Sequence, residues 1–408
     1  MNRIHRHQAV LLAVSTLSLL LVSCRETPVS NVDRERLFTL SYGRYEDEID
    51  LFQLASSSTG ADTQLFMKDG MFYIANSGSQ KVLQFTSFGD LLSVYYNAET
   101  NPQPSFGAIS QQEQGASTRR AVAHPLNHPV YLAVDNLKRL YVSDRLPVER
   151  YEFDSENQLV LREVVLRFGT DGQYLDYIGQ EGPGGTPFPP IDGVFVTSRN
   201  ELAVITKSQS GLQVFWFSPD GSLLYRIPFQ YRSLPDPYGG EKKAYASLEK
   251  IIPDSDTRRL YVKIDYYTED IDEATRANAG ISFDRSCLYP FSIENAAYDE
   301  RIDLPVFEGV DKDRLGTFSF KKPYELLGIT STGWIFLSTP SESGYTLEIL
   351  DSRSRRIQRR YLSIAPDELV YNALHVSSGG ILSALLASDY DARIVWWRTD
   401  MIIGEALR

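Results

Sequence analysis

Few side chains in this sequence have the types and spacing that chemistry at a protein site requires. Beyond residue 24 the only histidines are His124, His128 and His375. The first two are four residues apart, the spacing at which a helix places two metal ligands on one face. Pro125 and Pro129 break such a helix. We therefore expect a solvated loop here, and we predict no metal site.

Acidic residues are the other candidate ligands. Asp135 and Asp144 could line the mouth of a channel, although such aspartates more often cap turns by accepting hydrogen bonds from backbone amides. The run DYYTEDIDE (265–273) does not follow the spacing of a calcium-binding loop, so we expect a solvated acidic loop. Since no nucleophile elbow, phosphate loop, CxxC or HExxH motif occurs, we predict no catalytic residue and no cofactor.

Cys24 is the most informative reactive residue. It follows a segment with the build of an export signal, in which Arg3 and Arg6 precede the apolar stretch 9–21, which is too short to span a bilayer as a stable helix. The sequence Leu-Val-Ser-Cys at 21–24 resembles the lipobox of bacterial lipoproteins. The resemblance implies cleavage before Cys24, a diacylglycerol on its sulfur and acylation of the new amino terminus. The alternative is a secretory peptide with Cys24 as an ordinary thiol.

This reading divides the chain into three parts. Residues 1–23 are the expected lipoprotein signal peptide, 24–35 are the acylated cysteine and an unstructured polar tether, and 36–408 are the folded domain. Two or three acyl chains hold a protein on a membrane, because each buried methylene contributes about 0.8 kcal/mol. We therefore expect a domain anchored to the cell membrane or outer membrane, in the periplasm or at the cell surface.

Charge and cysteine content limit the class of partner. The chain has 41 Lys and Arg against 53 Asp and Glu, a formal charge of −12. This argues against nucleic acid, whose binding depends on neutralising phosphates, and against electrostatic attachment to anionic lipid. After cleavage Cys287 would be the only cysteine beside Cys24, so no disulfide is expected within the domain. We expect Cys287 to be a small buried residue of a strand.

The domain is predicted to be all-β. Aromatic residues make up 12% of the chain, and short apolar or alternating runs recur between turn residues. The runs group into six similar units, whose first recognisable strands begin near Phe72, Leu140, Leu202, Leu260, Ile335 and Ile381. The turn sequences FTSFGDLL (85–92), FGTDGQYL (168–175) and FSPDGSLL (217–224) recur after the following strand. Their glycines supply the positive φ of a tight hairpin turn.

A meander of three or four strands cannot bury both of its faces, so the units must pack against one another. Six of them arranged radially form a β-propeller. HPVYLAVDNLKRLYVSD (128–144) resembles the NHL repeat, and with the lipobox the chain is similar to NHL-type propeller lipoproteins of spirochaete-like bacteria. Five or seven blades would require region 245–330 to be one insertion or two units. We expect the segment 36–43 to close the ring beside the last strands, near 393–403.

Long connections suggest where a partner would bind. Segments 97–129, 179–190 and 233–245 lack strand patterns, and long loops in compact domains are commonly functional. Phe188, Tyr238 and Tyr245 are the expected interface aromatics, although packing against the domain is the commoner fate of such residues.

Two functions are compatible with this pattern. The first is a membrane-anchored scaffold of the cell envelope that binds a protein or glycan through one propeller face and its long loops. The alternative is an envelope hydrolase or lyase with a metal in the propeller channel.

Overall fold

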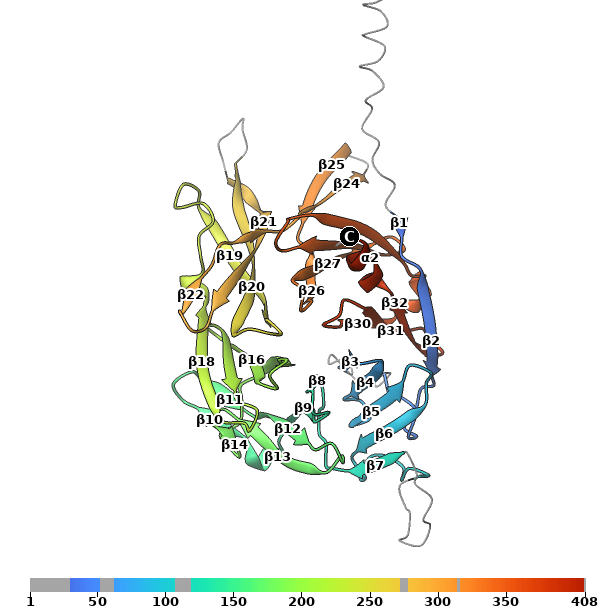
Figure 1. Ribbon diagram of the computed structural model, residues 1–408. Coiled ribbons are helices and arrows are strands. Elements are labelled where there is room, and N and C mark those ends of the chain that lie inside the picture. The colour runs from blue at the N-terminus through green and yellow to red at the C-terminus, as the bar shows by residue number, and fades with distance from the viewer. Residues whose placement is uncertain (1–29, 52–61, 107–118, 272–277, 314–315, 407–408) are drawn as a thin grey trace, which may run out of the picture.

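The chain forms a six-bladed β-propeller, as the sequence predicts. A computed structural model describes residues 30–51, 62–106, 119–271, 278–313 and 316–406. Six antiparallel sheets follow one another around a ring (Figure 1). Each blade runs outward from an inner strand beside the axis, and region 245–330 supplies one blade and one extra hairpin rather than two blades.

The first three blades use residues 63–230. Blade 1 contains β3 (Thr63–Lys68), β4 (Met71–Asn76), β5 (Lys81–Thr86) and β6 (Leu91–Tyr96), with β7 (Arg120–Ala123) parallel to β6 at the outer edge. Blade 2 contains β8 (Leu132–Val134), β9 (Leu140–Arg145), β12 (Glu163–Phe168), β13 (Tyr174–Gly179) and β14 (Gly182–Pro183), and a hairpin of β10 (Glu152–Asp154) and β11 (Leu159–Leu161) is inserted. Blade 3 contains β15 (Ile191–Val196), β16 (Leu202–Ser208), β17 (Gly211–Phe217) and β18 (Leu223–Gln230).

The last three blades use the rest of the chain and its amino-terminal strands. Blade 4 contains β19 (Ala244–Pro253), β20 (Arg259–Ile271), β21 (Asn278–Ser292), β22 (Ala297–Tyr298) and β23 (Ile302–Asp303); the hairpin β24 (Phe307–Asp313) and β25 (Gly316–Lys322) follows. Blade 5 contains β26 (Glu325–Ile329), β27 (Trp334–Ser341), β28 (Gly344–Asp351), β29 (Ile357–Ser363) and β1 (Ser30–Asn31). Blade 6 contains β30 (Tyr371–Val376), β31 (Leu382–Ala387), β32 (Ala392–Trp397) and β2 (Arg34–Leu40). Short 3-10 turns lie at Val148–Arg150, Tyr231–Ser233 and Pro366–Glu368.

The recurring turn sequences join the third and fourth strands of blades 1, 2 and 3. Gly89, Gly172 and Gly221 have φ values of 89°, 81° and 97°, so each adopts the left-handed conformation that the sequence predicts. In each case the strand pairing shifts register beside the turn, at Phe85, Phe168 and Phe217. One turn sequence therefore recurs because one hairpin geometry recurs.

The hydrophobic core consists of six separate layers, each between two neighbouring blades. Alternate residues of one strand contribute to different layers: Val262 packs toward blade 3 and Tyr261 toward blade 5. Cys287 is fully buried in β21, as predicted. Because each sheet is apolar on both faces, every blade needs two neighbours.

The ring is closed by the predicted pairing of the amino-terminal strand with the last strand. β2 pairs antiparallel with β32, so residues from opposite ends of the sequence form one sheet. The Glu368 carboxylate, which is 6% exposed, holds this junction. It binds Arg34 of β2 at 2.8 Å and Arg393 of β32 at 3.0 Å. These two ion pairs connect the outer strand β2 to the rest of blade 6.

Three parts of the chain differ from expectation. Residues 30–31 and 34–35 lie in β1 and β2, so this part of the expected tether is not unstructured. The helix α2 (Thr399–Ala406) was not predicted; its buried Ile403 packs between blades 5 and 6. Residues 265–271 of the expected acidic loop belong to β20. The signal peptide and Cys24 lie outside the described residues.

Within the described part of the chain, no helix has the length and apolar character needed to cross a membrane.

Glu368→Gln should destabilise the propeller by about 2 kcal/mol at neutral pH, because the two arginines lose a charged partner. Burial raises the pKa of the Glu368 carboxyl, but Arg34 and Arg393 outweigh this and leave the pKa below its usual value. The carboxylate therefore stabilises the fold fully above the unfolded pKa of about 4.3, and this contribution is lost as pH falls through the folded pKa. Thermal unfolding between neutral and acidic pH measures both effects.

Asp367→Asn is the matched control, since Asp367 is exposed on the same turn. It should leave the unfolding temperature near that of the parent protein. Equal unfolding temperatures for the parent and Glu368→Gln at neutral pH would contradict the assigned role of the ion pairs.

Candidate functional site

The two faces of the propeller carry connections of very different length. The connections from first to second and from third to fourth strands share one face, here named the turn face, because successive strands are antiparallel. They range from two residues (69–70) to five (169–173). The opposite face, here named the loop face, carries the connections between second and third strands and between blades.

The long connections of the described chain belong to the loop face. Residues 146–162 with the β10–β11 hairpin, residues 231–243, and the 304–324 connection with β24–β25 all leave from it. In blade 4 the strands themselves extend in that direction, since β20 and β21 have 13 and 15 residues. The turns of the other face hold the blades together, and the loop face is free to vary.

A central cavity of about 810 Å³ runs along the axis between the inner strands of all six blades. Each inner strand is an edge strand, so one row of its backbone N–H and C=O groups lacks a strand partner and faces this channel. Side chains from neighbouring blades bind some of these groups. Lys68 Nζ donates to the Val134 carbonyl at 2.9 Å, and Lys250 Nζ donates to the Leu326 carbonyl at 2.9 Å. The channel wall therefore combines polar backbone groups with apolar side chains.

Charged groups of opposite sign meet on the channel wall. The ammonium group of Lys250 in blade 4 interacts electrostatically with the carboxylates of Glu325 and Asp192. Burial lowers the pKa of Lys250, and the two carboxylates oppose that shift. His375 of β30 lines the channel next to blade 1, with its Nε2 3.3 Å from the Met67 carbonyl oxygen. Burial lowers the pKa of His375 to about 4, so the imidazole is neutral at physiological pH. The wall offers donors and acceptors rather than one dominant charge.

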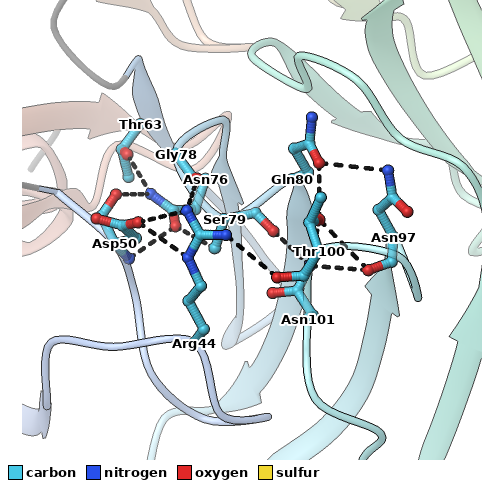
Figure 2. Close-up of polar contacts among 10 residues, drawn as sticks. All are labelled: Arg44, Asp50, Thr63, Asn76, Gly78, Ser79, Gln80, Asn97, Thr100 and Asn101. Atoms are coloured by element: carbon cyan, nitrogen blue, oxygen red, sulfur yellow. Dashed lines mark hydrogen bonds and ion pairs between the residues drawn. The ribbon is translucent and has the colours of Figure 1, made fainter. Parts of the chain in front are cut away.

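A buried hydrogen-bond network fixes the loop face at blade 1 (Figure 2). The Asn76 amide donates to the Asp50 carbonyl at 2.9 Å and to Thr63 Oγ1 at 2.8 Å, and its oxygen accepts from the Asp50 amide at 2.9 Å. Arg44 binds Asp50 at 3.1 Å and the Thr100 carbonyl at 3.1 Å. Two separate loops are thus held to the β4–β5 turn in one arrangement.

Phe188 does not serve as the exposed interface aromatic that the sequence predicts. It is 0% exposed and packs edge-to-face against Phe215 at a centroid distance of 5.0 Å. Its backbone also forms a bridge with Glu163 of blade 2. The Pro/Gly-rich segment around it folds back between blades 2 and 3, so an apolar ring there gains more by burial than by exposure.

Tyr238 and Tyr245 both lie in the long connection and first strand of blade 4, on the loop face. Tyr238 is half-buried; its hydroxyl donates to Asp284, and Arg285 lies 4.8 Å from its ring centroid. Burial would raise the pKa of Asp284, but its donors Tyr238, Arg285 and Lys242 bring the pKa to about 2. Tyr245 is 39% exposed and donates to Glu269 at 2.8 Å. Only Tyr245 presents a largely accessible ring.

The other candidate residues have structural partners. His128 lies 3.1 Å from Asp62, and the His124 ring stacks on Tyr174 at 4.6 Å. Asp144 accepts from the Asn127 amide at 3.1 Å, and Asp135 accepts from the Arg139 amide at 2.8 Å. Asp135 therefore caps its own turn, which was the commoner alternative, whereas Asp144 binds the backbone of a segment earlier in the chain.

The expected solvated acidic loop is wrong for Asp265, which is 1% exposed and paired with Lys263 at 2.6 Å. Burial raises the pKa of the Asp265 carboxyl, and Lys263 opposes this. Strand alternation explains the difference, because residue 265 points between blades 4 and 5. Among the described residues, no three His, Cys, Asp or Glu side chains come together as a possible metal site.

Sequence reasoning missed the channel charges Asp192, Lys250 and Glu325. Each of these charges lies in a mainly apolar inner strand, and the repeated pattern is strongest in the second and third strands of each blade. A search for a polar residue at equivalent positions just before the six recognised strands could have found them.

No protein-family model and no curated protein matches the sequence. Among solved structures, the chain is similar to a gluconolactonase of Xanthomonas campestris at 12% identity and a TM-score of 0.40, with 90% of this chain and 97% of that chain covered. An ulvan lyase has 10% identity and a TM-score of 0.38, covering 90% and 83%. The β-propeller domain of the trilobed protease of Pyrococcus furiosus has 6% identity and a TM-score of 0.38, covering 83% of each chain. At these identities and scores the similarity gives no activity.

Asn76→Ala should destabilise the protein by about 2 kcal/mol, because it leaves buried backbone groups of Asp50 without partners. Amide hydrogen exchange should rise in residues 44–50 and stay unchanged in blade 4. Asn157→Ala, at the exposed β10–β11 turn, is the control and should do neither. Unchanged exchange at 44–50 would show that the network does not fix the loop.

Proposed function

We propose that this protein is a lipid-anchored binding protein of the bacterial cell envelope, which engages another envelope component through the loop face. The observation that carries the proposal is the concentration of long, apolar-tipped connections on that face. A catalytic role is not part of this proposal.

Large apolar side chains are exposed on the projecting parts of the loop face. They come from the β10–β11 insertion, the extended strands of blade 4 and the β24–β25 hairpin, and include Phe153 (62%), Ile271 (62%), Ile281 (54%), Val310 (65%) and Phe320 (42%). Exposed apolar groups spread over several neighbouring projections are typical of protein-binding surfaces. A protein partner therefore fits this face better than a glycan.

The loop face is also preorganised where the structure describes it. The network around Asn76 and the ion pairs of Asp284 hold its loops without a ligand. A surface that is ordered before binding loses less conformational entropy on association. This supports recognition of a partner by a rigid face.

The lipid anchor would keep this domain close to the membrane. Only residues 25–29 separate Cys24 from β1. A fully extended chain of that length spans about 20 Å. The partner would therefore be a component that lies near the membrane surface.

Site-specific photocrosslinking tests the loop-face proposal in intact cells of the native host. A photoreactive phenylalanine at Phe153 or Ile271 should give a discrete crosslinked species whose partner is identified by mass spectrometry. The matched turn-face positions are Phe88 and Leu137, which are 87% and 55% exposed. These should give none. Equal crosslinking from both faces, or crosslinking from the turn face alone, would reject the proposal.

Cys24→Ser should prevent acylation and move the cleaved protein from the membrane fraction to the soluble fraction, because the acyl chains are the anchor proposed here. Detergent phase partitioning and the mass of the amino-terminal peptide measure this. Cys287→Ser is the control and should stay in the membrane fraction. An unmodified amino terminus in the parent protein would contradict the anchor.

A further inference from the structure

A second cavity lies at the outer rim of blade 5. Its volume is about 430 Å³, and its lining shares only Tyr324 with that of the channel. Three separate parts of the chain line it. β1 contributes Asn31, the connection that follows blade 4 contributes Phe307 and Glu308, and strands β28 and β29 form the third part. The volume lies in the range of small-molecule pockets.

Aromatic rings provide the apolar part of this rim pocket. Phe307 and the buried Tyr324 meet edge-to-face at a centroid distance of 6.1 Å. Tyr361 of β29 is half-buried, and its hydroxyl is 2.8 Å from Ser343 Oγ. Because their neighbours already fix these rings, they lose little side-chain conformational entropy when a ligand packs against them.

A buried carboxylate orients the polar groups of the pocket. Glu348 is 0% exposed, and its Oε1 accepts from the Tyr324 hydroxyl at 3.1 Å and from Arg359 Nε at 2.6 Å. Its Oε2 is buried without a hydrogen-bond partner among the described residues. Glu348 does not line the pocket itself, so it acts on the pocket through the lining residues Tyr324 and Arg359.

The two charged residues that line the pocket, Glu308 and Arg359, have opposite signs. Arg359 is paired with Glu348, and Glu308 at the rim lies 3.7 Å from Lys321. An anion would meet the carboxylates, and a cation would meet the Arg359 guanidinium. The pocket lining thus combines aromatic rings with donors and acceptors, and Lys322 Nζ lies 4.5 Å from the centroid of the Phe307 ring.

We propose that the rim pocket binds a neutral saccharide. The C–H faces of a pyranose ring are flat and apolar and suit Phe307 and Tyr361, while its hydroxyls can donate to or accept from the lining residues Arg359, Glu308 and Thr346. This site is distinct from the loop face and goes beyond the function proposed above.

The experiment uses the full-length protein in detergent micelles with defined sugars. Cellobiose and N,N′-diacetylchitobiose are the neutral probes, and digalacturonic acid is the charged counterpart. Saturation-transfer NMR reports contact with the sugar ring protons, and calorimetry gives the dissociation constant. Binding of at least one neutral probe, with weaker or no binding of digalacturonic acid, is expected.

Two substitutions locate the binding. Tyr361→Ala should weaken binding about tenfold, which is the effect of losing one stacking ring, and Tyr361→Phe should preserve it. Tyr174→Ala on β13, where the ring is 41% exposed, is the matched control and should change nothing. If circular dichroism shows that Tyr361→Ala does not fold, Thr346→Ile narrows the same pocket and should weaken binding equally.

Three outcomes would overturn the proposal. These are no binding of either neutral probe, binding of digalacturonic acid as tight as theirs, or unchanged binding by Tyr361→Ala and Thr346→Ile. The crosslinking test of the loop face uses other residues. Its outcome therefore does not depend on whether the rim pocket binds a saccharide.

Discussion

The structure depends on the burial of two apolar faces by every blade. A single four-stranded sheet can cover neither face, and a stack of sheets leaves two faces exposed at its ends. Only a closed ring gives every blade two neighbours, and the six core layers between the blades follow from this. The pairing of β2 with β32 is therefore a requirement of the core as well as of the sheet edge.

Ring closure also separates the two faces. Strands directed alternately up and down place the short turns on one side, where their geometry is fixed by the distance between adjacent strands. The connections between blades lie on the other side and can lengthen without disturbing the core layers. The inner strands at the axis do not pair with one another, so backbone polar groups lie beside apolar side chains on the wall of the channel that they surround.

The layer between blades 4 and 5 contains more buried charged side chains than a purely apolar layer would. Their shared layer contains apolar Leu288 and Leu337, but also the buried Lys263–Asp265 pair and Glu348. Buried charges need partners, and here they obtain them from side chains of the same blade. This polar layer lies between the channel and the rim pocket, and Tyr324 lines both.

The sequence by itself determined what depends on neighbours along the chain. These features are the six strand units, the glycine turns such as that at Gly221, and the closing strand, because periodicity, positive φ and hairpin spacing are local properties. Tertiary structure alone decided which side chains are exposed. Phe188 and Asp265 lie in segments that look like surface loops, yet a neighbouring blade covers both. Asp192, Lys250 and Glu325 are far apart in sequence, and only the closed ring brings their three inner strands around one axis.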